Sequence, residues 1–171
     1  MNAEVSSESQ VDRISLDDFD AIYEAYYQPV YRAVRAIVLD AALAEDVTQN
    51  AFLKAYRHRA RYRPTGSLGG WLHKIGVREA ISALRWRNVQ DRLLATLTLG
   101  AHRHQPDAAL GGQLSSLLQQ LSPGSRAAVV LFYFHGSRYR EVATMLGIPE
   151  GTVATRISNG LRKMRQVIDS D

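Results

Sequence analysis

Apolar residues recur at spacings of three and four along most of the chain, which is the period of an α-helix with one buried face. No stretch alternates apolar and polar residues convincingly, so strands are not expected. Asp17 or Asp18 can cap a first helix that ends near Asp40. The inward stripe of this helix comprises Phe19, Ile22, Tyr26, Val30, Val34 and Val38. The pattern predicts an all-α protein.

Two further helices are predicted in the first half of the chain. One covers residues 43–59, with Val47, Phe52 and Ala55 facing inward. Residues 62–70 contain three glycines and a proline and are predicted to form a loop. The next helix covers residues 71–87, and its expected core positions are Leu72, Ile75, Ala80 and Leu84.

Periodicity weakens over residues 88–112, which we interpret as a linker to a second helical domain. In that domain Ser122 is predicted to cap a helix with Pro123 at its first position. Residues 139–146 form a short amphipathic pattern, and residues 147–149 read Gly-Ile-Pro, a tight turn. The helix after the turn carries Val153, Ile157, Leu161 and Met164 on its inner face.

Charge is distributed unevenly along the chain. Residues 1–56 carry a net charge of −6, residues 57–92 one of +7 and residues 93–171 one of +3. This order favours a basic partner for the first third and a polyanion such as nucleic acid for the second, although a solvated surface would look the same. Without cysteine, disulfides and thiolate chemistry are excluded. The absence of a membrane-length apolar stretch or signal-peptide pattern leads us to expect a cytoplasmic protein without membrane insertion.

The segment from Tyr139 to Met164 carries the strongest functional signal, because two short helices joined by Gly-Ile-Pro are typical of a helix-turn-helix. Its second helix would enter the DNA major groove and expose Thr152, Thr155, Arg156 and Asn159 to base edges or backbone. A plain helical hairpin is the alternative. In the helix over residues 43–59, polar side chains share an outer face that could dock on a basic partner or simply be solvated.

The whole constellation resembles the extracytoplasmic-function (group four) sigma factors of bacterial RNA polymerase over about residues 17–166. Ala44-Glu-Asp-Val-Thr-Gln-Asn-Ala-Phe-Leu-Lys-Ala55 resembles the polymerase-binding helix of region two. Trp71-Leu72, Ile75 and Leu84-Arg85 resemble its promoter-melting helix. The region-four resemblance is carried by Leu121-Ser-Pro, Arg126, Gly136 to Tyr139, Glu141-Val-Ala, Leu146-Gly-Ile-Pro, Gly151-Thr-Val and Arg156.

Residues 1–15 are rich in Ser, Glu, Asp and Gln with little apolar content and are predicted to form a disordered tail. The resemblance implies region two over residues 16–88, a flexible linker over 89–112 and region four over 113–171. It implies binding to the clamp helices of the largest polymerase subunit through Glu45, Asp46, Gln49 and Asn50, and to the flap of the second-largest subunit. The implied contacts to the minus-ten element are Arg61, Tyr62, Arg63, Lys74, Arg78, Arg85 and Trp86. Those to the minus-thirty-five element are Arg138, Thr152, Thr155, Arg156, Asn159, Arg162 and Lys163. Trp71 is expected in the core.

The chain departs from the family pattern at several of these positions. Arg78 and Ser82 stand where the family usually has Asn and Asp, and Arg138 replaces a usual serine or threonine cap, so a typical promoter sequence is not implied. A stand-alone helix-turn-helix regulator is the first alternative. An enzyme with a metal at His102, His104 and Asp107 is a weaker one, because no third histidine or nucleophile accompanies them. We expect no enzymatic activity, cofactor or metal, a monomer when free, and a possible anti-sigma factor as a further partner.

Overall fold

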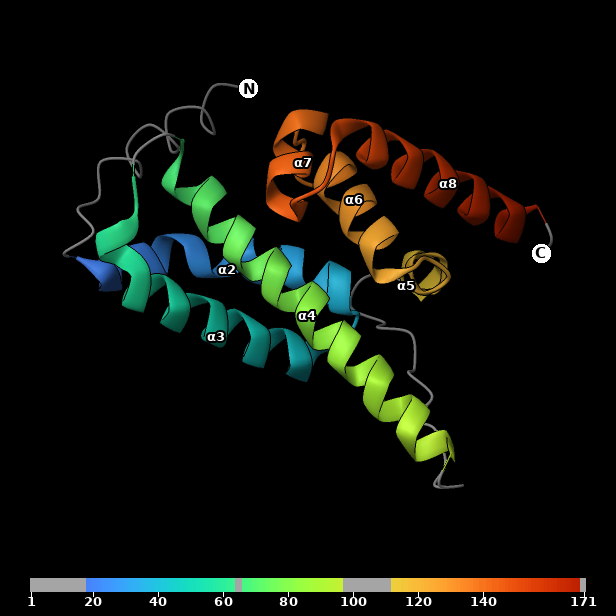
Figure 1. Ribbon diagram of the computed structural model, residues 1–171, viewed down its shortest axis with the longest axis horizontal. Helices are drawn as coiled ribbons and strands as arrows, with labels where there is room; N and C mark the ends of the chain where they lie inside the picture. Colours follow the sequence, from blue (N-terminus) through green and yellow to red (C-terminus); the bar gives the residue numbers. More distant parts are fainter. Residues whose placement is uncertain (1–17, 64–65, 97–111, 170–171) are drawn as a thin grey trace.

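The computed structural model describes residues 18–63, 66–96 and 112–169, and every regular element in these ranges is helical (Figure 1). The elements are α2 (Phe19–Val38), α3 (Ala41–His58), the 3-10 turn η1 (Arg59–Arg61), α4 (Leu68–Thr96), α5 (Gly112–Gln119), α6 (Pro123–Tyr133), α7 (Tyr139–Leu146) and α8 (Glu150–Ile168). The all-α prediction is confirmed. The predicted tail, most of the predicted linker and the His102, His104 and Asp107 group lie outside the described residues.

Helices α2, α3 and α4 pack as a bundle whose core follows the predicted stripes. In α2 the side chains of Ile22, Val30 and Val34 are buried, and Asp18 caps the helix by accepting a hydrogen bond from the Ala21 N–H at 3.2 Å. Helix α4 crosses α2 at Gly76, where an added Cβ would lie 2.7 Å from Val30 Cγ1. Glycine therefore permits this close approach of the two helices.

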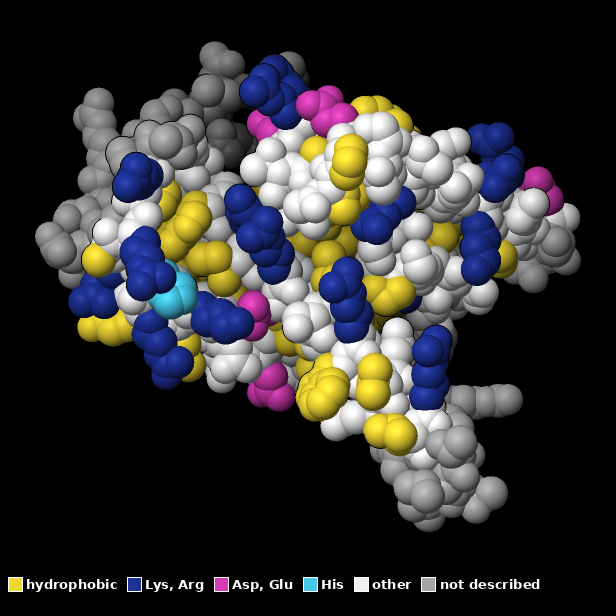
Figure 2. Space-filling view, in the orientation of Figure 1, with side chains coloured by type: hydrophobic (Ala, Val, Ile, Leu, Met, Phe, Trp, Pro, Cys, Tyr) yellow, Lys and Arg dark blue, Asp and Glu magenta, His cyan; other side chains and the backbone are white. Residues whose placement is uncertain are grey.

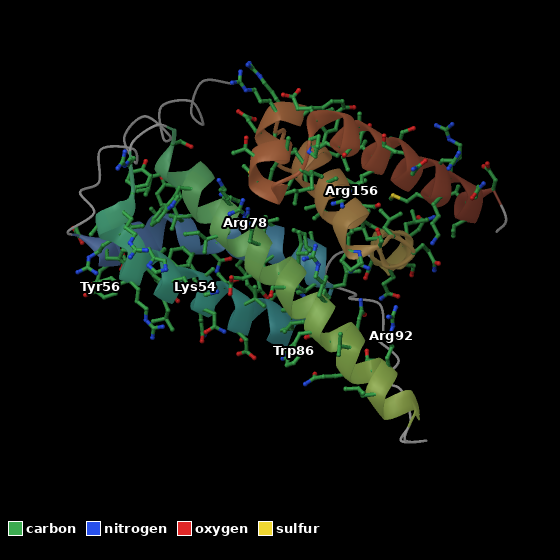
Figure 3. The ribbon with its side chains drawn as sticks, viewed as in Figure 1. Lys54, Tyr56, Arg78, Trp86, Arg92 and Arg156 are labelled. Atoms are coloured by element: carbon green, nitrogen blue, oxygen red, sulfur yellow. The ribbon has the colours of Figure 1, made fainter. Side chains whose placement is uncertain are left out.

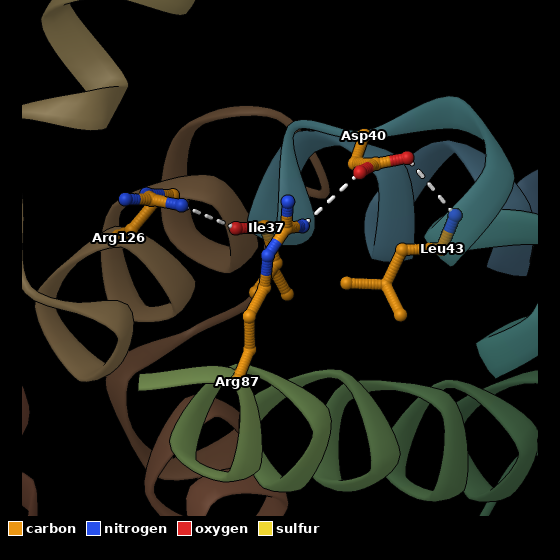
Figure 4. Close-up of polar contacts among 5 residues, drawn as sticks. All are labelled: Ile37, Asp40, Leu43, Arg87 and Arg126. Atoms are coloured by element: carbon orange, nitrogen blue, oxygen red, sulfur yellow. Dashed lines mark hydrogen bonds and ion pairs between the residues drawn. The ribbon is translucent and has the colours of Figure 1, made fainter. Parts of the chain in front are cut away.

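Asp40 fixes the corner between α2 and α3 and ties it to α4. One carboxylate oxygen accepts the Leu43 N–H at 3.0 Å and so caps α3, while the other pairs with Arg87 Nη1 at 3.0 Å (Figure 4). Leu39, just before it, adopts left-handed backbone geometry at φ 59° with its side chain buried. Burial of this side chain offsets the cost of a conformation that non-glycine residues rarely adopt.

Helix α4 is longer at both ends than the sequence predicted. It begins at Leu68, so Gly69 and Gly70 lie in its first turn, where the Gly70 N–H donates to Ser67 Oγ at 3.0 Å. At the other end it passes the predicted stop near Arg87 and continues to Thr96, into the stretch assigned to the linker. Residues 88–96 contain no glycine or proline, so nothing in them ends a helix that is already formed.

Helices α5 to α8 form a second unit that lies against α2 and α4 (Figure 1). Ser122 caps α6 by accepting the Ser125 N–H at 3.3 Å, and Pro123 begins the helix, as predicted. The turn between α7 and α8 has Gly147 at φ 66°, the left-handed geometry that glycine adopts freely. Val142, Val153 and Ile157 are buried. No described helix is long and apolar enough to cross a membrane.

Arg126 on α6 joins the two units. Its side chain is buried and donates to three backbone carbonyls: Leu118 O at 2.8 Å, Leu121 O at 3.1 Å and, across the interface, Ile37 O at 2.7 Å (Figure 4). Burial lowers the pKa of Arg126 to about 10, which still leaves the guanidinium charged at neutral pH. The end of α2 is thus held by a side chain of the C-terminal unit.

Candidate polymerase and promoter interfaces

Helix α3 presents the four polar side chains that the resemblance singled out on one exposed face. Glu45, Asp46, Gln49 and Asn50 are all exposed, whereas Ala44, Val47, Thr48 and Ala51 on the opposite face are buried. The Thr48 hydroxyl is satisfied by the Ala44 carbonyl at 2.6 Å. This face therefore carries acceptors and negative charge that the fold itself does not use.

A row of aromatic side chains on α2 adjoins that polar face. Tyr23, Tyr27 and Tyr31 are four residues apart, and the ring centroids of successive members lie 4.9 and 6.1 Å apart. Phe52 of α3 packs edge-on against Tyr23 at 5.0 Å. Burial, and then the charges and dipoles of Tyr23 and Glu45, raise the pKa of Tyr27. The surface next to Glu45 is thus a half-exposed aromatic ledge.

The candidate minus-ten residues before α4 are two exposed arginines and one tyrosine that packs within the fold. Arg61, at the end of η1, and Arg63 have exposed side chains. Tyr62 packs against Trp71 with ring centroids 5.0 Å apart, and its hydroxyl donates to Gly66 O at 3.0 Å. Trp71 is half-buried against the core, as expected. Tyr62 therefore serves the packing of this loop in the structure.

The candidates on α4 are distributed along its length, with Lys74 half-buried near the first turns. Arg78 and Arg85 are exposed on the side that faces the C-terminal unit. Trp86 is 68% exposed, on the stretch of α4 that leads away from the bundle (Figure 3). It is the first member of an apolar stripe with Val89 and Leu93, both also exposed. Trp86 is thus an aromatic without an aromatic partner in the described fold.

Helices α7 and α8 have the helix-turn-helix geometry that the sequence predicted, but their outer side chains are not all free. Thr155 and Asn159 are exposed, and Asn159 Oδ1 accepts from Arg162 Nη2 at 2.9 Å. Thr152 and Arg156 are half-buried, which corrects the prediction that they are exposed. Arg156 turns toward α6, where a Cβ added to Gly124 would lie 2.7 Å from its Nη1.

The remaining minus-thirty-five candidates lie at the two ends of the motif. Lys163 is exposed on α8. Arg138 precedes α7, and its backbone N–H donates to Glu141 Oε2 at 2.7 Å. Glu141 thus caps the helix from its third position in place of a serine or threonine before it. This arrangement explains how α7 tolerates arginine at its N-cap.

A cavity of about 400 Å³ lies between α4 and the helix-turn-helix. It is lined by candidates from both predicted DNA-binding sets. Arg78 and Arg85 line it from α4, and Arg156 lines it from α8. Figure 3 labels Arg78 and Arg156. Arg78 Nε also donates to Met145 O, at the end of α7, at 3.1 Å. In this arrangement the two units turn part of their basic surfaces toward each other. Figure 2 shows further Lys and Arg side chains across the same face of the molecule.

Two histidines meet at the same interface. His73 of α4 and His135, after α6, have ring centroids 4.9 Å apart. His73 Nδ1 lies 2.8 Å from Gly69 O and must carry the proton, since a carbonyl only accepts. Burial, and secondarily His73, lower the pKa of His135 to about 4, so its ring is neutral at neutral pH.

Comparisons with known proteins agree with this two-unit architecture. The family model described as Sigma-70 region 2 matches residues 22–89, and the model described as Sigma-70, region 4 matches residues 111–164. The chain is 32% identical to RNA polymerase sigma factor CarQ of Myxococcus xanthus, over 89% of this chain and 90% of that protein. The chain belongs to the ECF sigma factors of RNA polymerase. ECF sigma factor SigE of Mycolicibacterium smegmatis is 30% identical over 92% of this chain, which spans 64% of that relative.

Solved structures show the same fold for this sigma factor. Sigma factor RpoE, in its complex with anti-sigma factor NepR from Bartonella quintana, superposes with a TM-score of 0.72 and 21% identity over 91% of this chain and 99% of that one. CnrH, in its complex with the cytosolic domain of CnrY, gives 0.68 and 22% identity over 99% of both chains. The sigma-factor prediction is confirmed over the stand-alone regulator, because region 2 is matched as well as region 4. As a transcription initiation factor, the protein is not an enzyme.

Sequence reasoning missed three features of this sigma factor. The aromatic ledge had a visible signal, because Tyr23, Tyr27 and Tyr31 repeat every four residues. The cross-unit role of Arg126 had a weaker one: it is the single charge within the run from Pro123 to Phe134. The contact of His73 with His135 had none, because pairs far apart in sequence follow from packing alone.

Proposed function

We propose that this sigma factor binds core RNA polymerase through the outer face of α3 and recognises promoters with two separate surfaces. Glu45, Asp46, Gln49 and Asn50 would meet the basic clamp helices of the largest subunit, and region 4 would meet the flap of the second-largest. The supporting observation is the exposed polar face of α3, whose acceptors and charges are unused within the fold. The site of action is the cytoplasm, where bacterial polymerase works.

Promoter recognition is divided between the two units in this proposal. Exposed Arg61 and Arg63 hold phosphates of the melted minus-ten strand, and Trp86 offers an exposed ring on which an unstacked base can stack. On α8, Thr155 and Asn159 face outward to read the minus-thirty-five duplex in its major groove. In this proposal Arg138, Arg162 and Lys163, all exposed, contact the duplex backbone.

The two units must separate for both promoter elements to be bound together. The elements are centred roughly 80 Å apart on B-form DNA, at about 34 Å per helical turn. In the structure Arg78 and Arg156, one from each set, line the same 400 Å³ cavity, which is too small for a duplex. We therefore assign the described arrangement to the free protein and an opened one to the promoter complex. Complexes of the fold relatives with the anti-sigma factor NepR and with the domain of CnrY support an anti-sigma factor as a further partner.

Co-elution with core polymerase, followed by transcription from a library of upstream sequences, tests the proposal. Asp46→Asn removes one charge from the α3 face and is expected to weaken polymerase binding about tenfold, on the scale of a lost charge-assisted hydrogen bond. Asp169→Asn removes another exposed carboxylate, after α8 and far in sequence from α3, and is the matched control. Equal binding by both variants would contradict the assignment of the α3 face, and duplex binding without polymerase would contradict the whole proposal.

A further inference from the structure

The cavity between α4 and the helix-turn-helix is lined by positive charge without a compensating carboxylate. Besides Arg78, Arg85 and Arg156, its lining includes Ser82, Asn88 and the start of α6 at Ser122 to Gly124, but no Asp or Glu. We refer to it as the arginine pocket. Arginines from two different units of the fold therefore line one open pocket of about 400 Å³.

Basic side chains outside the pocket pair with carboxylates of the fold, Arg87 on α4 and Lys54 on α3 among them. Among the described residues, Arg87 pairs with Asp40 at 3.0 Å and Lys54 pairs with Glu79 at 2.7 Å. Arg78 has only a neutral partner, the Met145 carbonyl, and no carboxylate of the described chain pairs with Arg85 or Arg156. Closing the two units thus brings like charges together, which costs free energy unless an anion neutralises them.

We propose that the arginine pocket binds a small anion of the phosphate class, of about the size of pyrophosphate, and that this anion holds the two units together. Planar guanidinium forks match phosphate oxygens in pairs, and three forks suit an anion with several negative charges. The pocket volume lies within the usual range for small-molecule sites. At the start of α6, the Gly124 backbone N–H, which has no intrahelical acceptor, adds a neutral donor on the same lining.

A bound anion would oppose promoter binding because of the arginines that it occupies, a step that rests on the proposed function. Arg78, Arg85 and Arg156 are also candidates for promoter contacts, so an anion that bridges them keeps both promoter surfaces turned inward. Promoter DNA offers the same phosphate chemistry and competes for the same guanidinium groups. The two ligands favour different arrangements of the units, because the small anion stabilises the closed arrangement and DNA binds the open one.

Calorimetric titration of the full chain with sodium pyrophosphate, without polymerase or DNA, tests the binding site. We expect saturable binding that sodium sulfate at matched ionic strength does not reproduce. Arg85→Gln and Arg156→Gln are each expected to weaken binding about tenfold. Arg57→Gln removes an exposed charge at the end of α3, outside the pocket, and is expected to leave binding unchanged. Circular dichroism verifies that each variant is folded.

A distance measurement tests the effect on the two units. Because the chain has no cysteine, His58→Cys on α3 and Ser158→Cys on α8, both exposed, introduce two unique dye positions. Pyrophosphate is expected to narrow the distance distribution and to oppose the widening caused by a short promoter duplex.

Three results would overturn the inference: no saturable binding at millimolar pyrophosphate, equal weakening by Arg57→Gln, or widening on pyrophosphate binding. Neither measurement involves polymerase. A protein that directs transcription but shows any of these results would overturn this inference alone, and one that binds pyrophosphate but not polymerase would overturn the proposed function alone.

Discussion

Arg126 offers the sharpest test of how the two units are held together. Its side chain makes three hydrogen bonds to carbonyls, two within the C-terminal unit and one to Ile37 of α2. Arg126→Met keeps an unbranched apolar stem, is shorter than arginine and removes every donor. Leu118 O still accepts the Leu121 N–H at 3.1 Å, so the loss is concentrated at Leu121 O and Ile37 O.

The expected magnitude follows from these partners. A buried acceptor left without its donor costs about 1–3 kcal/mol, and removing one partner of a buried charged network costs about 3–5 kcal/mol. The desolvation that lowers the Arg126 pKa to about 10 is relieved in the variant, which reduces the net cost. We therefore expect a loss of about 2–4 kcal/mol, of which the bond to Ile37 O contributes about 1–2 kcal/mol as weaker contact between the units.

Two measurements separate the two parts of this effect. Hydrogen exchange of the α6 and α8 amides reports the stability of the C-terminal unit, and the dye pair on α3 and α8 reports the separation of the units. Arg126→Lys keeps the charge but presents a single nitrogen, so it should retain part of the stability in both readouts. Exchange rates and distances in Arg126→Met that match the unmodified protein would refute the role assigned to this side chain.

Two other predictions concern the pH dependence and the helix crossing. The pKa of His135 is about 4 in the folded protein and about 6.5 in the unfolded chain, so the unfolded chain takes up a proton first as the pH falls. The stability of the folded protein is therefore unaffected by this group above pH 6.5 and decreases as the pH falls toward 4. Because of this group, the free energy of unfolding measured in urea should be about 1–3 kcal/mol lower at pH 4 than at pH 7. His135→Phe should remove that part of the pH dependence. A variant that loses as much stability in acid as the parent would contradict this. At the α2–α4 crossing, Gly76→Ala places its Cβ 2.7 Å from Val30 Cγ1 and should destabilise by about 1–2 kcal/mol. Gly151→Ala, with nothing within 4 Å, should be neutral or stabilising, and equal effects of the two alanines in urea unfolding would contradict the packing argument.

The local chemistry of the helices could be predicted from the sequence because it depends on neighbours in the chain. Asp18, Ser122 and Gly147 act where short-range rules placed them, as caps and as the turn. The outer face of α3 was predictable for the same reason, since helical period alone separates Glu45 from Val47. These features were visible before any tertiary contact was known.

The extent of α4 and the packing of the two units could not be predicted in this way. Gly69 and Gly70 look like breakers in the sequence, yet a Cβ on Gly69 would lie 2.8 Å from the Tyr26 ring, so glycine there serves a close contact within a helix. Arg156 looks like a solvent-facing residue of a recognition helix, and only the position of α6 shows why it turns inward. Both differences arise from contacts distant in sequence, which periodicity does not encode.

In the proposed function, the contacts between the units set the free-energy cost of opening the protein on a promoter. Arg126 to Ile37 O and Arg78 to Met145 O are polar contacts whose net contributions are about 1–3 kcal/mol each. Every 1.4 kcal/mol spent on opening lowers the apparent affinity for promoter about tenfold, because only the open fraction is competent to bind. Two such contacts therefore lower the affinity for DNA in the absence of polymerase. A polymerase interface of ordinary size can offset this free-energy cost of opening. The proposal therefore predicts that polymerase binds α3 before promoter DNA binds, since the polar face of α3 is exposed in the structure while Thr152 and Arg156 are half-buried.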